Sequence, residues 1–175
     1  MNKKKKFSKF YNKSIDKIYR FIFLKVESSE IAQDLTSQVF VKVWDKISKG
    51  KGDIENLSAY TFKIAKRELA DFYRSRTRFK IIPADQQEVR AIMDDESILA
   101  NPERFVKVES DFEKIKEALA LLSDEFQDVL ILRYVNGFSS KEIAELLGKS
   151  EGAVRVMVHR ALKDLKERLE RSKRV

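Results

Sequence analysis

The chain contains no cysteine, one histidine, five glycines and two prolines among its 175 residues. The lack of cysteine excludes a disulfide scaffold and fits a reducing compartment. With His159 as the sole imidazole, a zinc site of the usual cysteine and histidine composition is excluded too. Few glycines and prolines interrupt the chain, and apolar residues recur at helical spacing almost throughout. The sequence therefore predicts an all-α protein.

The chain has fewer acidic than basic residues, 28 against 36, and its formal net charge is +8. A basic excess favours polyanionic partners. The excess is uneven: residues 1–74 hold 17 basic and 9 acidic side chains, residues 75–112 hold 6 and 8, and residues 113–175 hold 13 and 11. Two basic regions thus flank an acidic middle.

Long apolar runs are also lacking, because no stretch approaches the ~18 residues needed to span a bilayer. The run Lys3–Lys6 precedes no apolar core of the kind that signal peptides carry. We therefore expect no membrane insertion and a cytoplasmic protein.

The most informative motif lies at Phe138–Arg168, which reads as two helices joined by a tight turn. Ser139 can cap the first helix, and Glu142 can reach back to complete a capping box. Gly148 stands where the chain must leave the helix with a positive φ, and Ser150 can cap the next helix at once. The turn of about three residues predicts a helix-turn-helix.

The second helix of this motif has two contrasting sides. Its expected buried arc holds Val154, Val158, Ala161 and Leu165, with Leu162 and Leu169 beside them. The opposite side offers donors for phosphates and base edges, with one apolar side chain that can meet a thymine methyl. That side carries Gly152, Arg155, Val156, His159, Arg160 and Lys163. The alternative is a helical hairpin whose basic face is only solvated. For His159, plain exposure is the alternative to a phosphate contact.

Two helices are expected before residue 50. The first covers about Phe7–Val26, and the second starts near Ser29, which can cap it. The expected buried face of the second helix holds Ala32, Leu35, Val39, Val43 and Trp44. Asp34, Gln38 and Lys42 stack along its other face, where a polar stripe is usually only solvated.

A third helix is expected at about Leu57–Arg76, after an exposed Gly- and Lys-rich loop at Ser48–Asn56. Cations along it alternate with aromatic rings, a pattern that suits single-stranded nucleic acid because cations follow the backbone and rings stack on bases. The set is Tyr60, Phe62, Lys63, Lys66, Arg67, Phe72, Tyr73, Arg74 and Arg76. A core position is the alternative for Phe72 and Phe62.

The middle of the chain, about Ser75–Asn101, contains both prolines and the acidic cluster Asp94–Glu96. Its weak periodicity predicts a flexible linker with a short helix near its end. We expect one small helical domain at 1–78, a linker at 79–108 and a helix-turn-helix domain at 109–175.

Three motifs in this order resemble the extracytoplasmic-function (ECF) group of bacterial sigma factors. The second helix carries Ala32–Phe40 (AQDLTSQVF) with Trp44, which is similar to the family's A-E-D-L-x-Q-E-x-F-x-x-x-W. Ile64–Arg74 (IAKRELADFYR) is similar to I-A-R-N-x-x-x-D-x-x-R. Leu122–Tyr134 (LSDEFQDVLILRY) resembles the helix L-P-x-x-x-R-x-V-L-x-L-R-Y before the helix-turn-helix.

The resemblance implies a sigma factor that directs RNA polymerase core to promoters. It implies promoter DNA and an anti-sigma factor as further partners, and no cofactor or metal. The second helix would bind the clamp helices of the largest subunit through Asp34, Gln38, Phe40 and Lys42. Family members also contact the β-subunit flap. The minus-ten strand would be held by Asn56, Tyr60, Lys63, Lys66, Arg67, Tyr73 and Arg74. The minus-thirty-five duplex would be read by Ser150, Arg155, Val156, His159, Arg160 and Lys163.

The chain departs from the family pattern at Gln33, Ser37 and Gln38, which make the polymerase-facing stripe less acidic. In the recognition helix, Ala153 replaces a frequent Thr, and Met157 replaces a frequent Arg or Lys and can either pack or face DNA. A stand-alone helix-turn-helix regulator with an N-terminal sensing or dimerising module is the competing interpretation. An enzyme acting on nucleic acid lacks support, since no metal-ligand cluster, phosphate loop or nucleophile with its base is evident.

Overall fold

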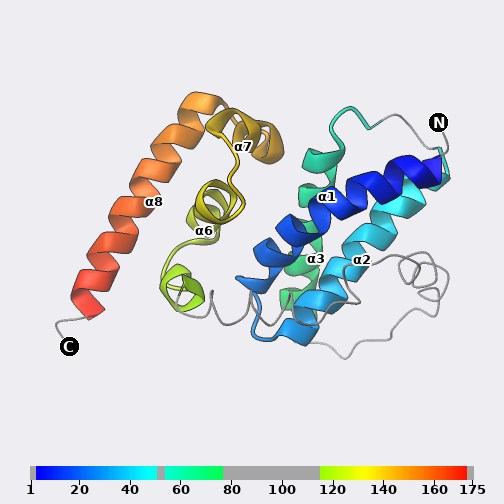
Figure 1. Ribbon diagram of the computed structural model, residues 1–175. Coiled ribbons are helices and arrows are strands. Elements are labelled where there is room, and N and C mark those ends of the chain that lie inside the picture. The colour runs from blue at the N-terminus through cyan, green and yellow to red at the C-terminus, as the bar shows by residue number, and fades with distance from the viewer. Residues whose placement is uncertain (1–2, 51–53, 77–114, 173–175) are drawn as a thin grey trace.

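The computed structural model describes residues 3–50, 54–76 and 115–172, and within these residues it contains helices and no strand (Figure 1). The N-terminal bundle consists of α1 (Lys3–Phe23), α2 (Ser29–Ser48) and α3 (Leu57–Ser75). The C-terminal bundle contains α6 (Asp124–Leu130), the π-helix η2 (Ile131–Val135), α7 (Ser140–Leu147) and α8 (Glu151–Ser172). The expected all-α class with two small helical domains is confirmed. The expected linker, 79–108, lies outside the described residues.

The N-terminal bundle forms because three amphipathic helices bury their apolar faces against one another. An aromatic cluster holds α1 against α2, with the rings of Phe7 and Trp44 centred 5.0 Å apart and those of Tyr11 and Phe40 centred 4.7 Å apart. Trp44 itself is only half-buried. The predicted inward face of α2 is confirmed at its other four positions, Ala32, Leu35, Val39 and Val43.

Polar caps fix where the N-terminal helices begin. Ser28, rather than Ser29, caps α2, because its hydroxyl accepts a hydrogen bond of 3.2 Å from the amide of Ile31. The prediction was wrong by one residue, since two adjacent serines offer the same chemistry and backbone geometry selects the extended one. Asn56 caps α3 by accepting from the amide of Ala59 at 2.9 Å.

The C-terminal bundle contains a feature that the periodicity does not predict. After Leu130 the helix widens into the π-helical turn η2, where the amide of Asn136 donates to the carbonyl of Ile131 at 3.0 Å. Ile131 and Leu132 are buried in this turn. The turn redirects the chain toward α7, and α8 then packs on both α6 and α7.

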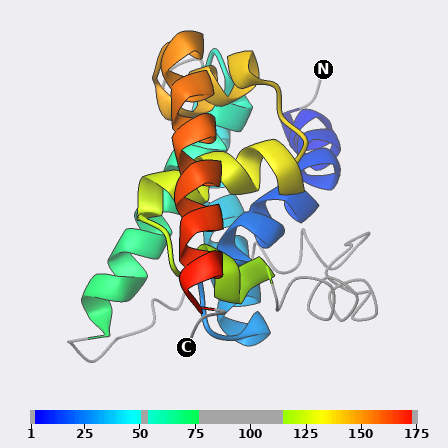
Figure 2. The ribbon, with the colours of Figure 1, turned by 90° about the vertical axis from the view of Figure 1, so that its left-hand side faces the viewer.

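The two bundles touch each other directly. Helix α3 packs on α7, and α1 packs on η2. The rings of Phe62 and Phe138 meet edge to face across this boundary, with centroids 5.7 Å apart. In the side view of Figure 2, α8 (orange to red) lies nearest the viewer. It packs on α6 and α7, on the side of the C-terminal bundle that faces away from the N-terminal helices. The cations Arg155, Arg160 and Lys163 of α8 are exposed.

Candidate nucleic-acid interface

The turn between α7 and α8 has the geometry that the sequence predicts. The hydroxyl of Ser139 accepts from the amide of Glu142 at 3.2 Å, and the amide of Ser139 donates to the Glu142 carboxylate at 2.7 Å. These hydrogen bonds lower the pKa of Glu142. Gly148 has φ 63° and ψ 38°, and Ser150 accepts from the amide of Ala153 at 3.1 Å. The capped helix-turn-helix is confirmed.

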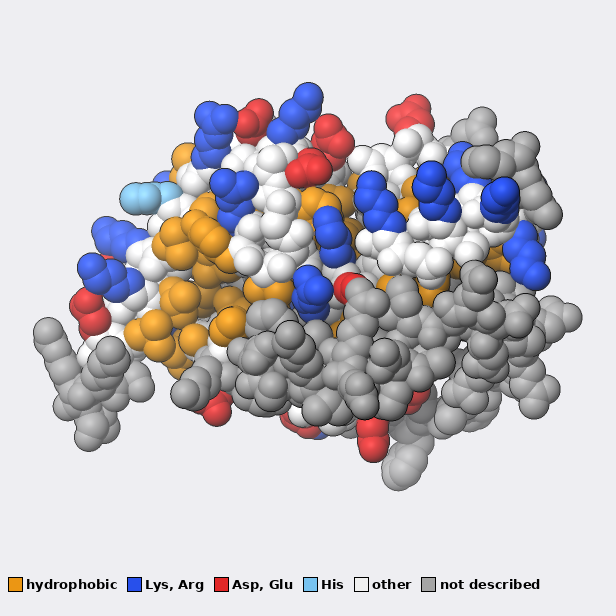
Figure 3. All heavy atoms as spheres, in the orientation of Figure 1, with side chains coloured by type: hydrophobic (Ala, Val, Ile, Leu, Met, Phe, Trp, Pro, Cys, Tyr) orange, Lys and Arg blue, Asp and Glu red, His pale blue; other side chains and the backbone are white. Residues whose placement is uncertain are grey.

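The outward side of α8 gathers the side chains expected to meet duplex DNA. Arg155 has 70% of its side chain exposed, although it also pairs with Glu151 one turn earlier at 2.5 Å. Figure 3 shows Lys and Arg side chains together with the single histidine over this part of the molecule. All six predicted positions are exposed: Ser150, Arg155, Val156, His159, Arg160 and Lys163.

The inward side of α8 corrects part of the expected buried arc. Val154 and Ala161 are fully buried, and Met157 is half-buried against the core, so Met157 packs. Leu162 and Leu169 are 41% and 38% exposed, contrary to the expectation that they pack inward. The other two expected positions, Val158 and Leu165, are half-buried against the core, so of the leucines in the second half of α8 only Leu162 and Leu169 lie at the surface.

Helix α3 presents a mixed face. Lys63 and Arg67 are exposed, whereas Lys66 pairs with Asp128 of α6 at 2.7 Å. Arg74 pairs with Asp71 on its own helix at 2.8 Å. The expected cations therefore lie along one helix, but not all of them are equally available to a ligand.

The aromatic residues of α3 divide between surface and core. Tyr73 is 47% exposed, and its hydroxyl donates to the carbonyl of Lys25. Tyr60 and Phe72 are half-buried, while Phe62 is 5% exposed and belongs to the core. A core position was the alternative for both Phe62 and Phe72, and of the two only Phe62 is fully in the core. Tyr73 is therefore the most accessible ring for base stacking on the described part of this helix.

Asn56 joins the start of α3 to the other bundle. While its side-chain oxygen caps α3, its amide nitrogen lies 3.2 Å from Glu145 of α7. Residues 51–53, in the middle of the expected exposed loop Ser48–Asn56, lie outside the described residues.

The four residues of α2 that are expected to contact polymerase differ in exposure and in their partners. Asp34 is exposed and Gln38 half-buried, as a contact surface needs. Phe40 is fully buried against α1, so its predicted role in polymerase contact is wrong: the ring fills the core. Lys42 pairs with Glu68 of α3, a carboxylate only 4% exposed, and thereby links the two helices.

Two charged residues at the boundary between bundles were not identified from the sequence. Lys25 lies in the turn after α1, and Asp128 lies in the last turn of α6. Asp128 stands beside Val129 and Leu130, both buried, and its own exposure is 1%. The only signal in the sequence is the apolar run Val129–Leu132 directly after Asp128, and it does not identify the partner of this carboxylate.

Two features are absent from the described residues. Within 3–50, 54–76 and 115–172, no group of three or more acidic, histidine or cysteine side chains is placed to hold a metal ion. Across those same residues, no helix combines the length and the apolar character needed to cross a membrane.

Family models match both bundles. The model described as sigma-70 region 2 matches residues 10–79, and that described as sigma-70, region 4 matches residues 112–165. The ECF RNA polymerase sigma factor ShbA of Streptomyces griseus is 32% identical over 143 residues, covering 80% of this chain and 72% of ShbA.

Further relatives match most of this chain. The sigma factor YlaC of Bacillus subtilis is 26% identical, with 93% of this chain and 91% of YlaC covered. The ECF sigma factor BldN of Streptomyces coelicolor is 27% identical over 91% of this chain, which spans only 58% of BldN's length.

Solved structures share the fold. The sigma factor RpoE, crystallised with the anti-sigma factor NepR from Bartonella quintana, gives a TM-score of 0.64 at 24% identity. That match covers 95% of this chain and 98% of RpoE. CnrH, in complex with the cytosolic domain of CnrY, gives 0.62 at 19% identity over 94% of this chain and 87% of CnrH. The capped helix-turn-helix, the basic third helix, both region models and the identity to ShbA place the chain in one family: it belongs to the ECF group of RNA polymerase sigma factors.

Proposed function

We propose that the protein brings RNA polymerase core to specific promoters and starts transcription there. The observation that carries this proposal is the order of the two matched regions, region 2 before region 4, in one chain. A stand-alone regulator needs a DNA-reading helix but has no need of region 2. In our proposal residues 1–78 and 109–175 act as two promoter-reading domains, and residues 79–108 connect them.

The C-terminal domain reads the minus-thirty-five element as duplex. The first turns of α8 enter the major groove, where Arg155, His159 and Arg160 reach phosphates and base edges while Val156 contacts a thymine methyl. Ser150 and Lys163 add contacts at the two ends of this surface. Exposure of all six side chains supports the assignment.

The N-terminal domain captures the minus-ten element after strand separation. Lys63, Lys66, Arg67 and Arg74 follow the backbone, Tyr60 and Tyr73 stack on bases, and Asn56 contacts the strand at the start of α3. Flipping a base costs a few kcal/mol, and stacking returns about 1–3 kcal/mol per base. The cationic face of α3, with the exposed ring of Tyr73, supports this role.

Polymerase binds the N-terminal domain at α2, where Asp34 and Gln38 meet the clamp helices of the largest subunit, and the C-terminal domain contacts the β-subunit flap. We propose an anti-sigma factor as a further partner, because RpoE and CnrH were solved with NepR and the cytosolic domain of CnrY. The protein acts in the cytoplasm as a non-catalytic initiation factor, without a cofactor.

In vitro transcription tests this function. Core polymerase is mixed with genomic DNA fragments, with and without the protein, and RNA 5′ ends are mapped. We expect discrete start sites that depend on the protein, each preceded by shared minus-ten and minus-thirty-five sequences. Binding of the protein alone to duplex operators, without start sites that depend on it, would instead establish the stand-alone regulator.

A further inference from the structure

The outer face of α1 carries a row of cations that the proposed function leaves without a partner. The helix contains eight basic residues and one acidic residue, Asp16. Most of the basic residues lie on the side opposite Phe7, Tyr11 and Ile15, which are buried. Figure 3 shows Lys and Arg side chains lined up over this helix. The lysine row consists of Lys5, Lys9, Lys13 and Lys17, spaced four residues apart, with Lys6 beside it.

The lysine row disfavours the helix that carries it. Like charges four residues apart on a helix repel each other, and the row contains three such steps. The first turn of α1 holds Lys3–Lys6 and no acid, although the N-terminal end of a helix favours negative charge. Asp16 is one turn from Lys13 and from Arg20, too far along the helix to offset the first half of the row. Cations kept where they cost stability indicate a role outside the folding of the helix.

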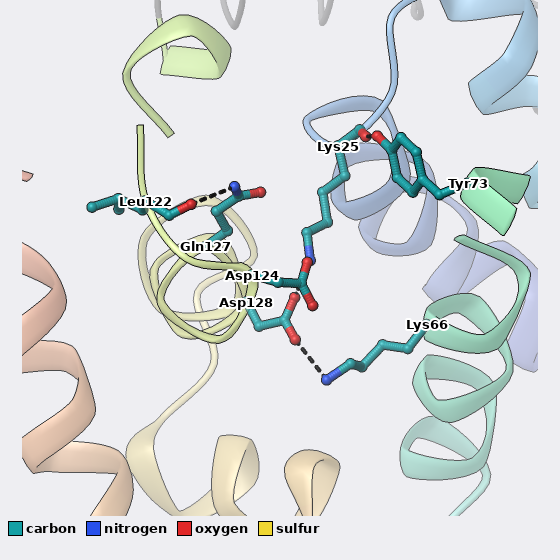
Figure 4. A network of polar contacts seen from close by, with 7 residues as sticks. All are labelled: Lys25, Lys66, Tyr73, Leu122, Asp124, Gln127 and Asp128. Carbon is teal, nitrogen blue, oxygen red and sulfur yellow. Dashed lines mark hydrogen bonds and ion pairs between the residues drawn. The ribbon is translucent and has the colours of Figure 1, made fainter. Parts of the chain in front are cut away.

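Several other cations of the protein have acidic partners, whereas the first half of the row has none. Lys25 and Lys66 both pair with Asp128 of α6 (Figure 4). Within the residues that the structure describes, the side chains of Lys5 and Lys9 form no ion pair or hydrogen bond, and both are exposed. Their ammonium groups are therefore available to an external anion.

The inner end of the row lies nearer to other groups. The ammonium of Lys17 is 4.1 Å from the centre of the Phe138 ring. The pKa of Glu142 on α7 is lowered chiefly by its hydrogen bonds with Ser139, and further by attraction to Lys17 and Lys13. The half of the row nearer the N-terminus is therefore the part most open to a ligand.

The chemistry of the row fits a phosphate backbone better than a protein or a membrane. Protein interfaces are depleted in lysine, and their binding energy comes from apolar and aromatic anchors. A helix that lies on a membrane inserts its apolar face, but the apolar face of α1 is buried in the core. No aromatic ring of α1 is exposed to stack on unpaired bases, because Phe10 is half-buried and the other rings are buried. These properties favour duplex DNA over a single strand.

The length of the row suits a contact with several phosphates. From Lys5 to Lys17 it covers about 18 Å, at ~1.5 Å per residue. One strand of a duplex presents about five phosphates over that length, at ~3.4 Å for each along the axis. Phosphate contacts carry no sequence information directly, so such a contact adds affinity for DNA of any sequence.

We propose that α1 is a third DNA contact of the protein, through which the lysine row binds the phosphate backbone of duplex DNA regardless of sequence. The inference goes beyond the proposed function, which uses α3 and α8 to read the promoter. In this role α1 raises the affinity for duplex beside the N-terminal bundle and leaves the choice of promoter to the other two helices.

The test measures binding of the free full chain to a fluorescent duplex of about 20 base pairs without promoter sequences, by anisotropy over a series of salt concentrations. The double variant Lys5→Gln with Lys9→Gln should reduce the slope of log affinity against log salt by about 1.8, or about 0.9 for each lost phosphate contact. The double variant Lys5→Arg with Lys9→Arg keeps both charges and should keep the wild-type slope. A wild-type slope in the glutamine variant would overturn the proposal.

A matched control separates the row from the net charge of the protein. Lys49→Gln with Arg171→Gln removes two exposed cations that lie outside the row, one at the end of α2 and one in the last turn of α8. This control should retain the wild-type slope. A loss equal to that of the row variant would show that only net charge matters and would contradict a contact at α1.

Thermal unfolding separates DNA binding from a structural role of the row. Because Lys5→Gln with Lys9→Gln relieves repulsion, this variant should unfold at the wild-type temperature or above it while it binds duplex more weakly. Loss of helix by circular dichroism together with loss of affinity would assign the row to folding and overturn the proposal.

Binding to poly-glutamate tests the other occupant. If the row served an acidic protein, the glutamine variant would lose poly-glutamate binding and keep the wild-type slope for duplex, which would overturn the proposal. Polymerase takes no part in these measurements, so their outcome is independent of the start-site assay for the proposed function.

Discussion

Glu68 shows how one side chain can set the relation between two helices. It is 4% exposed on α3, and its carboxylate is neutralised by Lys42 of α2, whose side chain is half exposed. An acid in such a position is costly unless paired. Lys42 belongs to the polar stripe of α2 that was expected to face polymerase. Its ammonium group instead pairs with α3 and stabilises its own bundle.

Replacing Lys42 with Ala should destabilise the N-terminal bundle by about 1–3 kcal/mol, because Glu68 then remains buried without its partner. Urea unfolding followed by the fluorescence of Trp44, the only tryptophan, reports on this bundle. Lys49→Ala is the matched control, since Lys49 pairs with Asp45 on the surface and should cost less than about 1 kcal/mol. Equal losses for the two variants would contradict the structural role of Lys42.

Some single residues could be placed correctly from the sequence, and others could not. The capping box at Ser139 and the positive φ at Gly148 follow from local chemistry, and both were predicted. Phe40 was misassigned because a signature position shared with a family does not reveal which way a ring points. Its burial against Tyr11 depends on how α1 and α2 cross, which no local pattern specifies.

At the scale of the element, α3 combines a core face with a cationic face. Thr61, Ile64 and Ala65 are buried, while Lys63 and Arg67 are exposed. This division follows from the sequence, because a period of 3.6 residues places the two sets on opposite sides of a helix. The sequence does not predict the π-helical turn η2, since a single extra residue in a buried helix leaves no periodic signal.

The exposed cations of α3 should contribute to strand binding through counterion release. Lys63→Ala and Arg67→Ala should each reduce the slope of log affinity against log salt by about 0.7, the value for one phosphate contact on a single strand. The measurement is oligonucleotide binding by the complex with core polymerase over a series of salt concentrations. Lys9→Ala, an exposed cation of α1, is the control. Unchanged slopes for both α3 variants would remove this helix from the strand path.

At the scale of the whole molecule, the sequence predicts two helical domains but not their contact. Lys66 and Asp128 lie far apart in the chain and on different bundles, and each resembles an ordinary surface or helix charge when read locally. The boundary between bundles arises only from the tertiary arrangement of α1, α3, η2 and α7. For that reason the cationic sides of α3 and α8 can be predicted from the sequence, whereas the ion pairs of Asp128 with Lys25 and Lys66 cannot.

In the proposed function, the contact with the clamp helices of polymerase and the reading of the upstream promoter element belong to different domains of one chain. The most direct test of this division measures core-polymerase affinity and initiation at a mapped promoter for Arg155→Ala and Asp34→Arg. Arg168→Ala is the control for the first, because Arg168 lies further along α8 and also pairs with an acid one turn before it. We predict that Arg155→Ala costs about 1–3 kcal/mol at the upstream element and leaves core affinity unchanged, whereas Asp34→Arg weakens core affinity and spares upstream recognition. Equal effects of both variants on core affinity would contradict the account.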